Sequence, residues 1–174
     1  MNRLFGILAC SAVGLSLAGP AAAEPANLLG VFGNWSAYTT GSGSDLTCYA
    51  LSKPRATRPA STKRSAIYLM ISDWPARKVK AEPQIVYGYQ GKEGTGAALG
   101  VGKDKFTFFI RNNAKEGSAW LQQLSDNASL ITAMQDGVSA VASGTSAKGT
   151  KTIDTYSLSG FGDALDKIHS VCQM

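Results

Sequence analysis

Two widely separated cysteines constrain the fold of this chain more than any other feature. The chain has 174 residues and three cysteines, of which Cys48 lies in the first third and Cys172 lies two residues before the last. A bond between these two would close a loop of about 125 residues and could stabilise the fold by up to about 5 kcal/mol, although 2 to 4 kcal/mol is common. Because disulfides persist in oxidising compartments, the pair also indicates export.

The third cysteine, Cys10, falls in a segment with the pattern of a secretory signal peptide. Residues 1–23 begin with a basic residue, continue with an apolar run over residues 4–17, and end in a Gly-Pro break followed by three alanines. That order is typical of a cleaved signal. We therefore expect cleavage after Ala23 and a single mature domain over residues 24–174. We expect this domain in the periplasm, either free or attached to the outer membrane or cell surface.

The competing interpretation of the leader is a lipoprotein box that ends at Cys10. It leaves an apolar region shorter than the roughly 7 to 15 residues that a signal needs. The apolar run is also shorter than the approximately 20 residues of a membrane-spanning helix, and the mature part contains no second such run, so we expect no transmembrane span.

Positive charge is concentrated in one part of the mature chain. Between residues 53 and 80 there are eight basic side chains and one acidic side chain, Asp73, whereas the rest of the mature chain is slightly acidic. The basic residues are Lys53, Arg55, Arg58, Lys63, Arg64, Arg77, Lys78 and Lys80. A field of this kind attracts anionic polymers and surfaces. We predict that these residues form an anion-binding surface, with residues 53–64 in a long exposed loop.

Short β-type segments dominate the pattern of the mature chain. Those rich in β-branched or aromatic residues cover residues 34–39, 46–51, 67–72, 84–90, 105–110, 138–144 and 150–158. Glycine, proline and serine clusters separate them. This predicts a mainly β fold, an antiparallel sandwich or a partly closed barrel. In the last segment Asp154 shares a face with Tyr156, which indicates either a partly solvated face or a bulge.

Two helices are expected among these strands. The first covers about residues 126–135, with Ser125 as N-cap and Gly137 after its end. The second begins after Ser159, which can cap its start, and its apolar positions form one continuous stripe that includes Cys172. We expect this C-terminal helix to pack on the sheet, where Cys172 can reach Cys48 in an early strand as a structural disulfide. Trp35 and Trp120 are expected in the core.

Three segments of the mature chain carry recognisable motifs. They are Phe32-Gly-Asn-Trp-Ser-Ala-Tyr38, Cys48-Tyr-Ala-Leu-Ser-Lys-Pro54, and the end of the chain from Gly144 to Cys172. Together they resemble the invasion associated locus B family of exported bacterial proteins. The resemblance implies a small periplasmic or outer-membrane-associated protein whose relatives were first linked to host-cell invasion. It defines no catalytic residues, and Cys48 and Cys172 carry over as a disulfide.

The sequence offers little that resembles an enzyme centre. His169 is the sole histidine and falls in the last helix, where we interpret it as a surface residue. One histidine and two paired cysteines cannot supply the usual zinc or copper ligands, so we expect no metal and no cofactor. Residues 144–151 resemble a phosphate loop only superficially, because the order after Gly149 is Thr-Lys, and we expect a hairpin turn there.

Three functions remain open on the sequence alone. The first is a non-enzymatic envelope protein that binds an anionic component or an acidic protein surface, and not nucleic acid, through the basic residues of 53–80. The second is a small secreted hydrolase or isomerase, which requires a pocket beside Asp154, Asp163 or His169. The third is a protein inhibitor or chaperone-like module, which requires an exposed apolar patch or strand edge.

Overall fold

The structure, a computed structural model, describes residues 25–61 and 63–174. The predicted signal peptide over residues 1–23 lies outside the described residues.

Among the described residues, eleven strands alternate with two α-helices and three short 3-10 helices. The strands are β1 (Asn27–Phe32), β2 (Trp35–Thr40), β3 (Thr47–Ser52), β4 (Ala56–Arg58), β5 (Tyr68–Trp74), β6 (Val79–Val86), β7 (Ala97–Val101), β8 (Asp104–Asn112), β9 (Gly117–Leu121), β10 (Ser139–Thr145) and β11 (Lys151–Ser157). The helices are η1 (Gly43–Asp45), η2 (Pro75–Arg77), η3 (Leu124–Asp126), α1 (Asn127–Asp136) and α2 (Phe161–Cys172).

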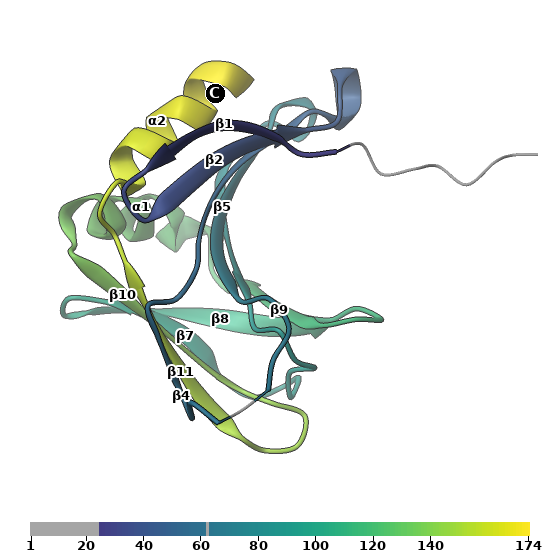
Figure 1. The fold of residues 1–174 in the computed structure, drawn as a ribbon, viewed down its shortest axis with the longest axis vertical. Coiled ribbons are helices and arrows are strands. Elements are labelled where there is room, and N and C mark those ends of the chain that lie inside the picture. The colour runs from purple at the N-terminus through teal and green to yellow at the C-terminus, as the bar shows by residue number, and fades with distance from the viewer. Residues whose placement is uncertain (1–24, 62) are drawn as a thin grey trace, which may run out of the picture.

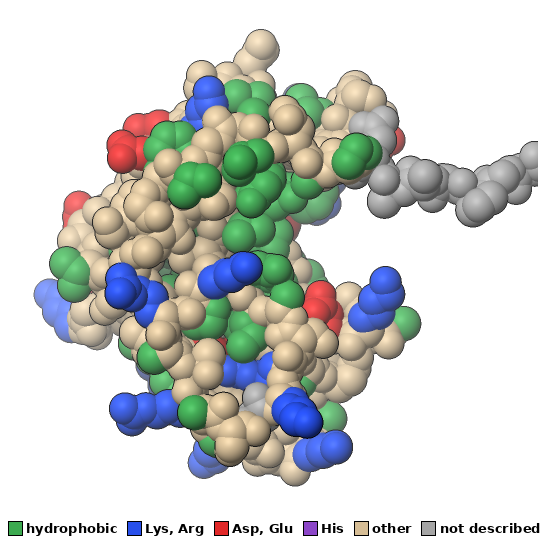
Figure 2. Space-filling model, in the orientation of Figure 1, with side chains coloured by type: hydrophobic (Ala, Val, Ile, Leu, Met, Phe, Trp, Pro, Cys, Tyr) green, Lys and Arg blue, Asp and Glu red, His purple; other side chains and the backbone are tan. Residues whose placement is uncertain are grey.

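The eleven strands form one sheet in the order β1-β2-β3-β5-β6-β9-β8-β7-β10-β11-β4, with antiparallel neighbours throughout. The sheet curls strongly but does not close, so β1 and β4 are its two edges (Figure 1). The curl leaves a hollow on one side of the molecule, along which hydrophobic side chains gather (Figure 2). The predicted mainly β antiparallel fold with an internal and a C-terminal helix is confirmed.

Helix α2 covers one face of the sheet near the β1 edge, where it packs on β1, β2, β3 and β5. Its apolar stripe is buried, as the sequence predicts; the buried positions are Phe161, Ala164, Leu165, Ile168 and Cys172. The ring centre of Trp35 lies 4.9 Å from that of Phe161. Its Nε1 donates a hydrogen bond to the carbonyl of Ser157. Trp35 thereby ties β2 to both the last strand and the last helix.

The link into α2 depends on two glycines rather than on a serine cap. Gly160, and not Ser159, is the N-cap, with φ of 85°. A Cβ on Gly160 would lie 1.9 Å from the carbonyl oxygen of Phe32, and one on Gly33 would lie 2.6 Å from that of Ser159. The β1–β2 turn and the start of α2 therefore pack backbone against backbone, which only glycine permits at these positions.

Several local predictions are wrong in instructive ways. Asp126 precedes α1 in place of the predicted Ser125 cap. The predicted loop over residues 53–64 contains an edge strand, β4, which pairs with β11. Trp120 is only half-buried, on the sheet face opposite α2, with its ring 6.2 Å from that of Phe109. The expected hairpin around residues 146–149, by contrast, is confirmed. It joins β10 to β11 with a regular register, so no bulge explains Asp154.

Candidate binding surface

The eight basic residues predicted to share one surface divide into two groups and a buried residue. Lys53, Arg55, Arg58 and Lys63 are exposed on and around β4, whereas Arg77, Lys78 and Lys80 are exposed on the turn from β5 to β6. Strand β4 is one edge of the sheet, while β5 and β6 are central. Proximity in the sequence therefore does not give one surface, and each group has its own neighbours.

Arg64 does not belong to the surface on which it was predicted, because its side chain is only 2% exposed. Its two terminal nitrogens donate to both carboxylate oxygens of Asp154, at 2.8 and 2.5 Å. This hydrogen bonding raises the pKa of Arg64. Asp154 is fully buried, so the charge that the sequence places on an apolar face of β11 is neutralised by an arginine 90 residues away.

Tyrosines surround this buried ion pair. The guanidinium of Arg64 lies 5.7 Å from the ring centre of Tyr89, which stacks on Tyr87 at 5.3 Å. Tyr89 shares a hydrogen bond of 2.6 Å with Thr152, and Tyr87 donates to the carbonyl of Ser143. Burial raises the pKa of Tyr87, Tyr89 and Tyr156. The hydroxyl of Tyr156 is buried with no hydrogen-bond partner among the described residues.

A Tyr156→Phe variant is expected to be as stable as the natural protein at neutral pH, or more stable by up to about 1 kcal/mol, because it removes an unsatisfied buried group. The folded-state pKa of Tyr156 is raised, so its ionisation favours the unfolded state and stability falls as the pH rises above the unfolded value of about 10. The variant should lose less stability above that pH. Urea unfolding between neutral and alkaline pH measures both effects, and a large loss at neutral pH with an unchanged alkaline slope would contradict them.

Three loops bring further basic side chains to the β4 side of the molecule. The amide of Lys92 donates to the carbonyl of Thr145, and the amide of Ala147 donates to that of Gln90, so the loop after Tyr89 lies beside the β10–β11 turn. The loop after β4 is held there as well, since the amide of Ser65 donates to the carbonyl of Gly88.

The exposed cations of these loops and strands form a group that we call the basic end. Its members are Arg58, Lys63, Lys92, Lys148 and Lys151. In Figure 2 lysine and arginine side chains are spread over this lower part of the molecule. In residues 59–65, 91–95 and 146–150 the one acidic residue is Glu93, which pairs with Arg111 at 3.7 Å. The basic end therefore keeps most of its positive charge.

The group on the β5–β6 turn is different because acidic side chains accompany it. The guanidinium of Arg77 lies 4.9 Å from the ring centre of Trp74, whose Nε1 donates to the carboxylate of Glu82 at 3.0 Å. Asp45 lines the same small hollow as Trp74 and Arg77. The ring of Trp74 thus lies between opposite charges, and this group has a weaker net field than the basic end.

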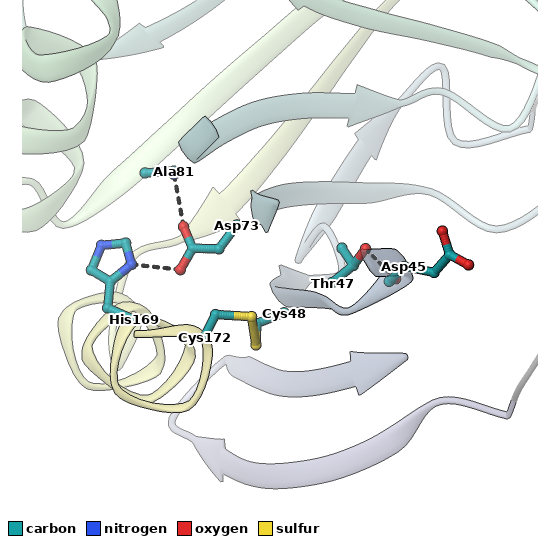
Figure 3. The surroundings of a disulfide bond; sticks show 7 residues. All are labelled: Asp45, Thr47, Cys48, Asp73, Ala81, His169 and Cys172. Carbon is teal, nitrogen blue, oxygen red and sulfur yellow. Dashed lines mark hydrogen bonds and ion pairs between the residues drawn. A yellow bond between two sulfur atoms is a disulfide. The ribbon is translucent and has the colours of Figure 1, made fainter. Parts of the chain in front are cut away.

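His169 is not the surface residue that its helix position predicts, since its side chain is 17% exposed and hydrogen-bonded. Its Nδ1 lies 2.7 Å from Oδ2 of Asp73, a fully buried carboxylate whose other oxygen accepts the amide of Ala81. Figure 3 shows this contact beside the Cys48–Cys172 disulfide, with His169 and Cys172 both reaching from α2 to the sheet. Cys48 and Asp73 are cross-strand neighbours, so two linkages hold α2 at one place.

His169 also borders an open, mainly apolar hollow between β6, η3, α1 and α2. Ser125, Ile131 and Lys80 line this hollow with His169. The hydroxyl of Ser125 donates a hydrogen bond to Oδ1 of its neighbour Asp126, at 3.5 Å. Asp163 and Asp166, the two acidic residues of α2, are exposed. The Asp73–His169 pair has the form of a catalytic acid and base, but it also joins the helix to the sheet.

In residues 25–61 and 63–174 no cluster of three or more His, Cys, Asp or Glu side chains has the arrangement of a metal site. None of the helices in the described part of the chain combines the length and the hydropathy needed to cross a bilayer.

These features define a small β-rich protein in which a disulfide fastens a C-terminal helix to a curled sheet. The chain belongs to the invasion associated locus B (IalB) family, whose model matches residues 35–169. The fold is similar to the crystal structure of invasion associated protein B from Bartonella henselae, with a TM-score of 0.60 and 15% sequence identity over 83% of this chain and 98% of that chain. A comparison with curated proteins finds no match.

Proposed function

We propose that this protein is a non-enzymatic envelope protein that binds an anionic component of the bacterial envelope through its basic end. In this proposal residues 1–23 are a signal peptide removed on export, and residues 24–174 act as one domain in the periplasm or at the outer membrane. The leader pattern, the disulfide and the membership of the family support export.

The observation that carries the proposal is the convergence of cations from separate parts of the chain. Arg58 lies on β4, Lys151 lies on β11, and the three remaining lysines of the basic end come from three different loops. Like charges repel, and gathering them lowers stability unless a partner offsets the repulsion. The buried Arg64–Asp154 pair holds the loop between β4 and β5 beside β11, which keeps Lys63 in this group.

The chemistry of the partner follows from the compartment and the charge. Phosphate groups of lipids and lipopolysaccharide, and the carboxylates of acidic glycans, are the anions that an exported bacterial protein meets. Lysine ammonium groups bind such anions as point charges without demanding a fixed geometry. The proposed partner is therefore an anionic surface or polymer, and the family's association with invasion would follow from contact at the envelope.

A non-enzymatic role also fits the Asp73–His169 pair. The pair lies beside the disulfide and connects α2 to β5, so its structural role is visible in its contacts. The alternative, a hydrolase that uses His169 as a base, requires that a His169→Gln variant lose an activity while keeping its stability. The binding proposal requires that this variant bind anionic surfaces as the natural protein does.

Reversing the charge of the basic end is expected to abolish binding to anionic vesicles. The variant Lys63→Glu/Lys92→Glu/Lys148→Glu changes three exposed lysines, and the matched control Arg77→Glu/Lys78→Glu/Lys80→Glu makes the same charge change on the β5–β6 turn. Each cation near an anionic surface contributes about 1 kcal/mol, so three reversals should weaken binding by more than a hundredfold. Co-sedimentation with phosphatidylglycerol-containing vesicles measures this.

The same measurement separates electrostatic from other binding. The natural protein should dissociate from anionic vesicles as the salt concentration is raised, since exposed charges are screened over about 8 Å at physiological ionic strength. Vesicles of neutral phosphatidylcholine should bind none of the variants. Equal loss of binding in both triple variants, or binding that resists high salt, would contradict the assignment to the basic end.

A further inference from the structure

Strand β1 is an edge strand with apolar side chains on its surface. It is the first strand of the sheet order and has β2 as its neighbour, so one side of its backbone is unpaired within the sheet. Leu28 is 52% exposed and Val31 is 65% exposed. An unpaired edge with exposed apolar residues is a template for pairing with another strand.

The opposite edge of the same sheet is more strongly protected against pairing than β1. Strand β4 has only three residues, is flanked by Pro54 and Pro59, and carries Arg58. Short length, proline and charge are the usual means by which proteins prevent edge pairing. Strand β1 has six residues, of which none is charged and none is proline. Glu24 and Pro25 precede it in the sequence, and no charged residue or proline follows until Asp45.

The irregularity that β1 does contain arranges its apolar side chains on one face. The register shifts between Leu28 and Gly30, so Leu28 lies opposite Tyr38 and Val31 lies opposite Ser36. Both positions share the face of β2 that points away from α2. Without the shift, residues three apart would alternate to opposite faces.

This face continues from β1 across the neighbouring strands as an apolar band. Tyr38 stacks on Tyr49 of β3 with ring centres 5.3 Å apart. In the next row Ser36 lies opposite Leu51, and Leu51 lies opposite Met70 of β5. A strand added beside β1 would therefore extend an existing apolar surface as well as pair its backbone.

We propose that β1 pairs antiparallel with β1 of a second copy of this chain, which gives a two-fold dimer with one continuous sheet. Two-fold symmetry makes the same strand edge both donor and acceptor, and side chains of the outer face of each copy then meet on the same side of the joint sheet. Leu28 and Val31 of one copy lie beside Leu28 and Val31 of the other.

The distribution of charge favours a second copy as the occupant of this edge. Because β1 and its surroundings lack charged residues over residues 26–44, the joint brings no like charges together. The basic end includes β4 and β11, at the other end of the sheet order, so the strongly positive regions of the two copies stay apart. A joint through β4 would instead place Arg55 and Arg58 against their own copies.

Sedimentation and light scattering over a range of concentrations test the pairing on residues 24–174. The natural protein should change from monomer to dimer as concentration rises. Val31→Lys, on the edge, should reduce the association constant at least tenfold, whereas the control Val138→Lys, at a position 86% exposed before β10, should associate as the natural protein does. A natural protein that stays monomeric throughout, or a Val31→Lys variant that dimerises normally, would overturn the proposal.

Hydrogen exchange identifies the strand that forms the contact, and thermal unfolding shows whether each variant is folded. In the natural protein and in Val138→Lys, the amides of β1 should exchange more slowly as the dimer forms, while in Val31→Lys they should not change. Leu28→Glu, on the same face, should behave as Val31→Lys does, and thermal unfolding should show both variants folded. A dimer whose slowed amides lie in β4 or α1 rather than β1 would also overturn the proposal.

Discussion

An Asp154→Ala variant is expected to lose about 3 to 5 kcal/mol of its free energy of unfolding. The substitution leaves the Arg64 guanidinium, whose side chain is 2% exposed, without the carboxylate that both its terminal nitrogens contact. Removing one partner of a buried ion pair costs this much because the remaining charge stays buried and unpaired. Urea unfolding measures the loss, which is a large part of the 5 to 15 kcal/mol that typically stabilises a domain.

Two companion variants show that the loss comes from the unpaired charge. Arg64→Met/Asp154→Leu removes both charges and should recover most of the stability, since apolar replacement of a buried pair is often neutral. Arg111→Met breaks the exposed pair with Glu93 and should change stability by no more than about 1 kcal/mol. A double variant as unstable as Asp154→Ala would show that the site depends on shape rather than on charge pairing.

Opening the Cys48–Cys172 bond is expected to lower the free energy of unfolding by about 2 to 4 kcal/mol. The cysteines are 124 residues apart in the sequence and their side chains are buried between β3 and α2, so the bond restricts nearly the whole unfolded chain. For a domain of this size that loss corresponds to a fall of about 5 to 15 °C in Tm. Thermal unfolding with and without reductant gives the measurement.

The control for the disulfide prediction is Cys48→Ala/Cys172→Ala. This variant should unfold at the Tm of the reduced protein and should not respond to reductant. Hydrogen exchange should quicken first in α2, although the Asp73–His169 contact still holds the helix. If the Tm of the natural protein is the same with and without reductant, the bond does not stabilise the fold.

Much of the fold follows from local patterns in the sequence. The apolar stripe of α2 and the turn at residues 146–149 are local signals, and the structure contains the corresponding helix and hairpin. The sequence does not predict β7, because its residues, Ala-Ala-Leu-Gly-Val, are mostly small and have little β preference. Ala97 and Ala98 are buried in this strand, which lies between β8 and β10 in the sheet.

The boundaries of β6 show how tertiary structure overrides a local signal. The sequence predicts a strand over 84–90, whereas β6 covers Val79–Val86 and includes Pro83. Proline cannot donate a hydrogen bond, which argues against an internal strand. The pairing with β9 begins only at Gln84, so Pro83 occupies a part of β6 where its missing amide is not needed by that neighbour.

The candidate site could be predicted only in part, because it is assembled from distant segments. Arg58 and Lys63 stand out in the basic segment of the sequence, but Lys92, Lys148 and Lys151 join them only through loop contacts. In the sequence Arg64 cannot be told from the exposed basic residues around it, because its partner Asp154 is 90 residues away. The signal for that partner was present: a lone carboxylate, Asp154, at an apolar strand position requires a buried cation.

A dimer formed through β1 would strengthen binding through the basic end. Two basic ends at opposite ends of one continuous sheet would contact an anionic surface at two places, and such bivalent binding exceeds the affinity of either contact. The Val31→Lys variant should then bind anionic vesicles more weakly than Val138→Lys while keeping its salt dependence.

Amide chemical shifts recorded during a titration with anionic lipid assemblies test the central claim most directly. Bicelles that contain phosphatidylglycerol should perturb residues 59–65, 91–95 and 146–151, and should leave the β5–β6 turn around Arg77 and the hollow beside His169 unchanged. Neutral bicelles should perturb none of these residues. Perturbation centred on His169, or on the turn with Arg77, would contradict binding through the basic end.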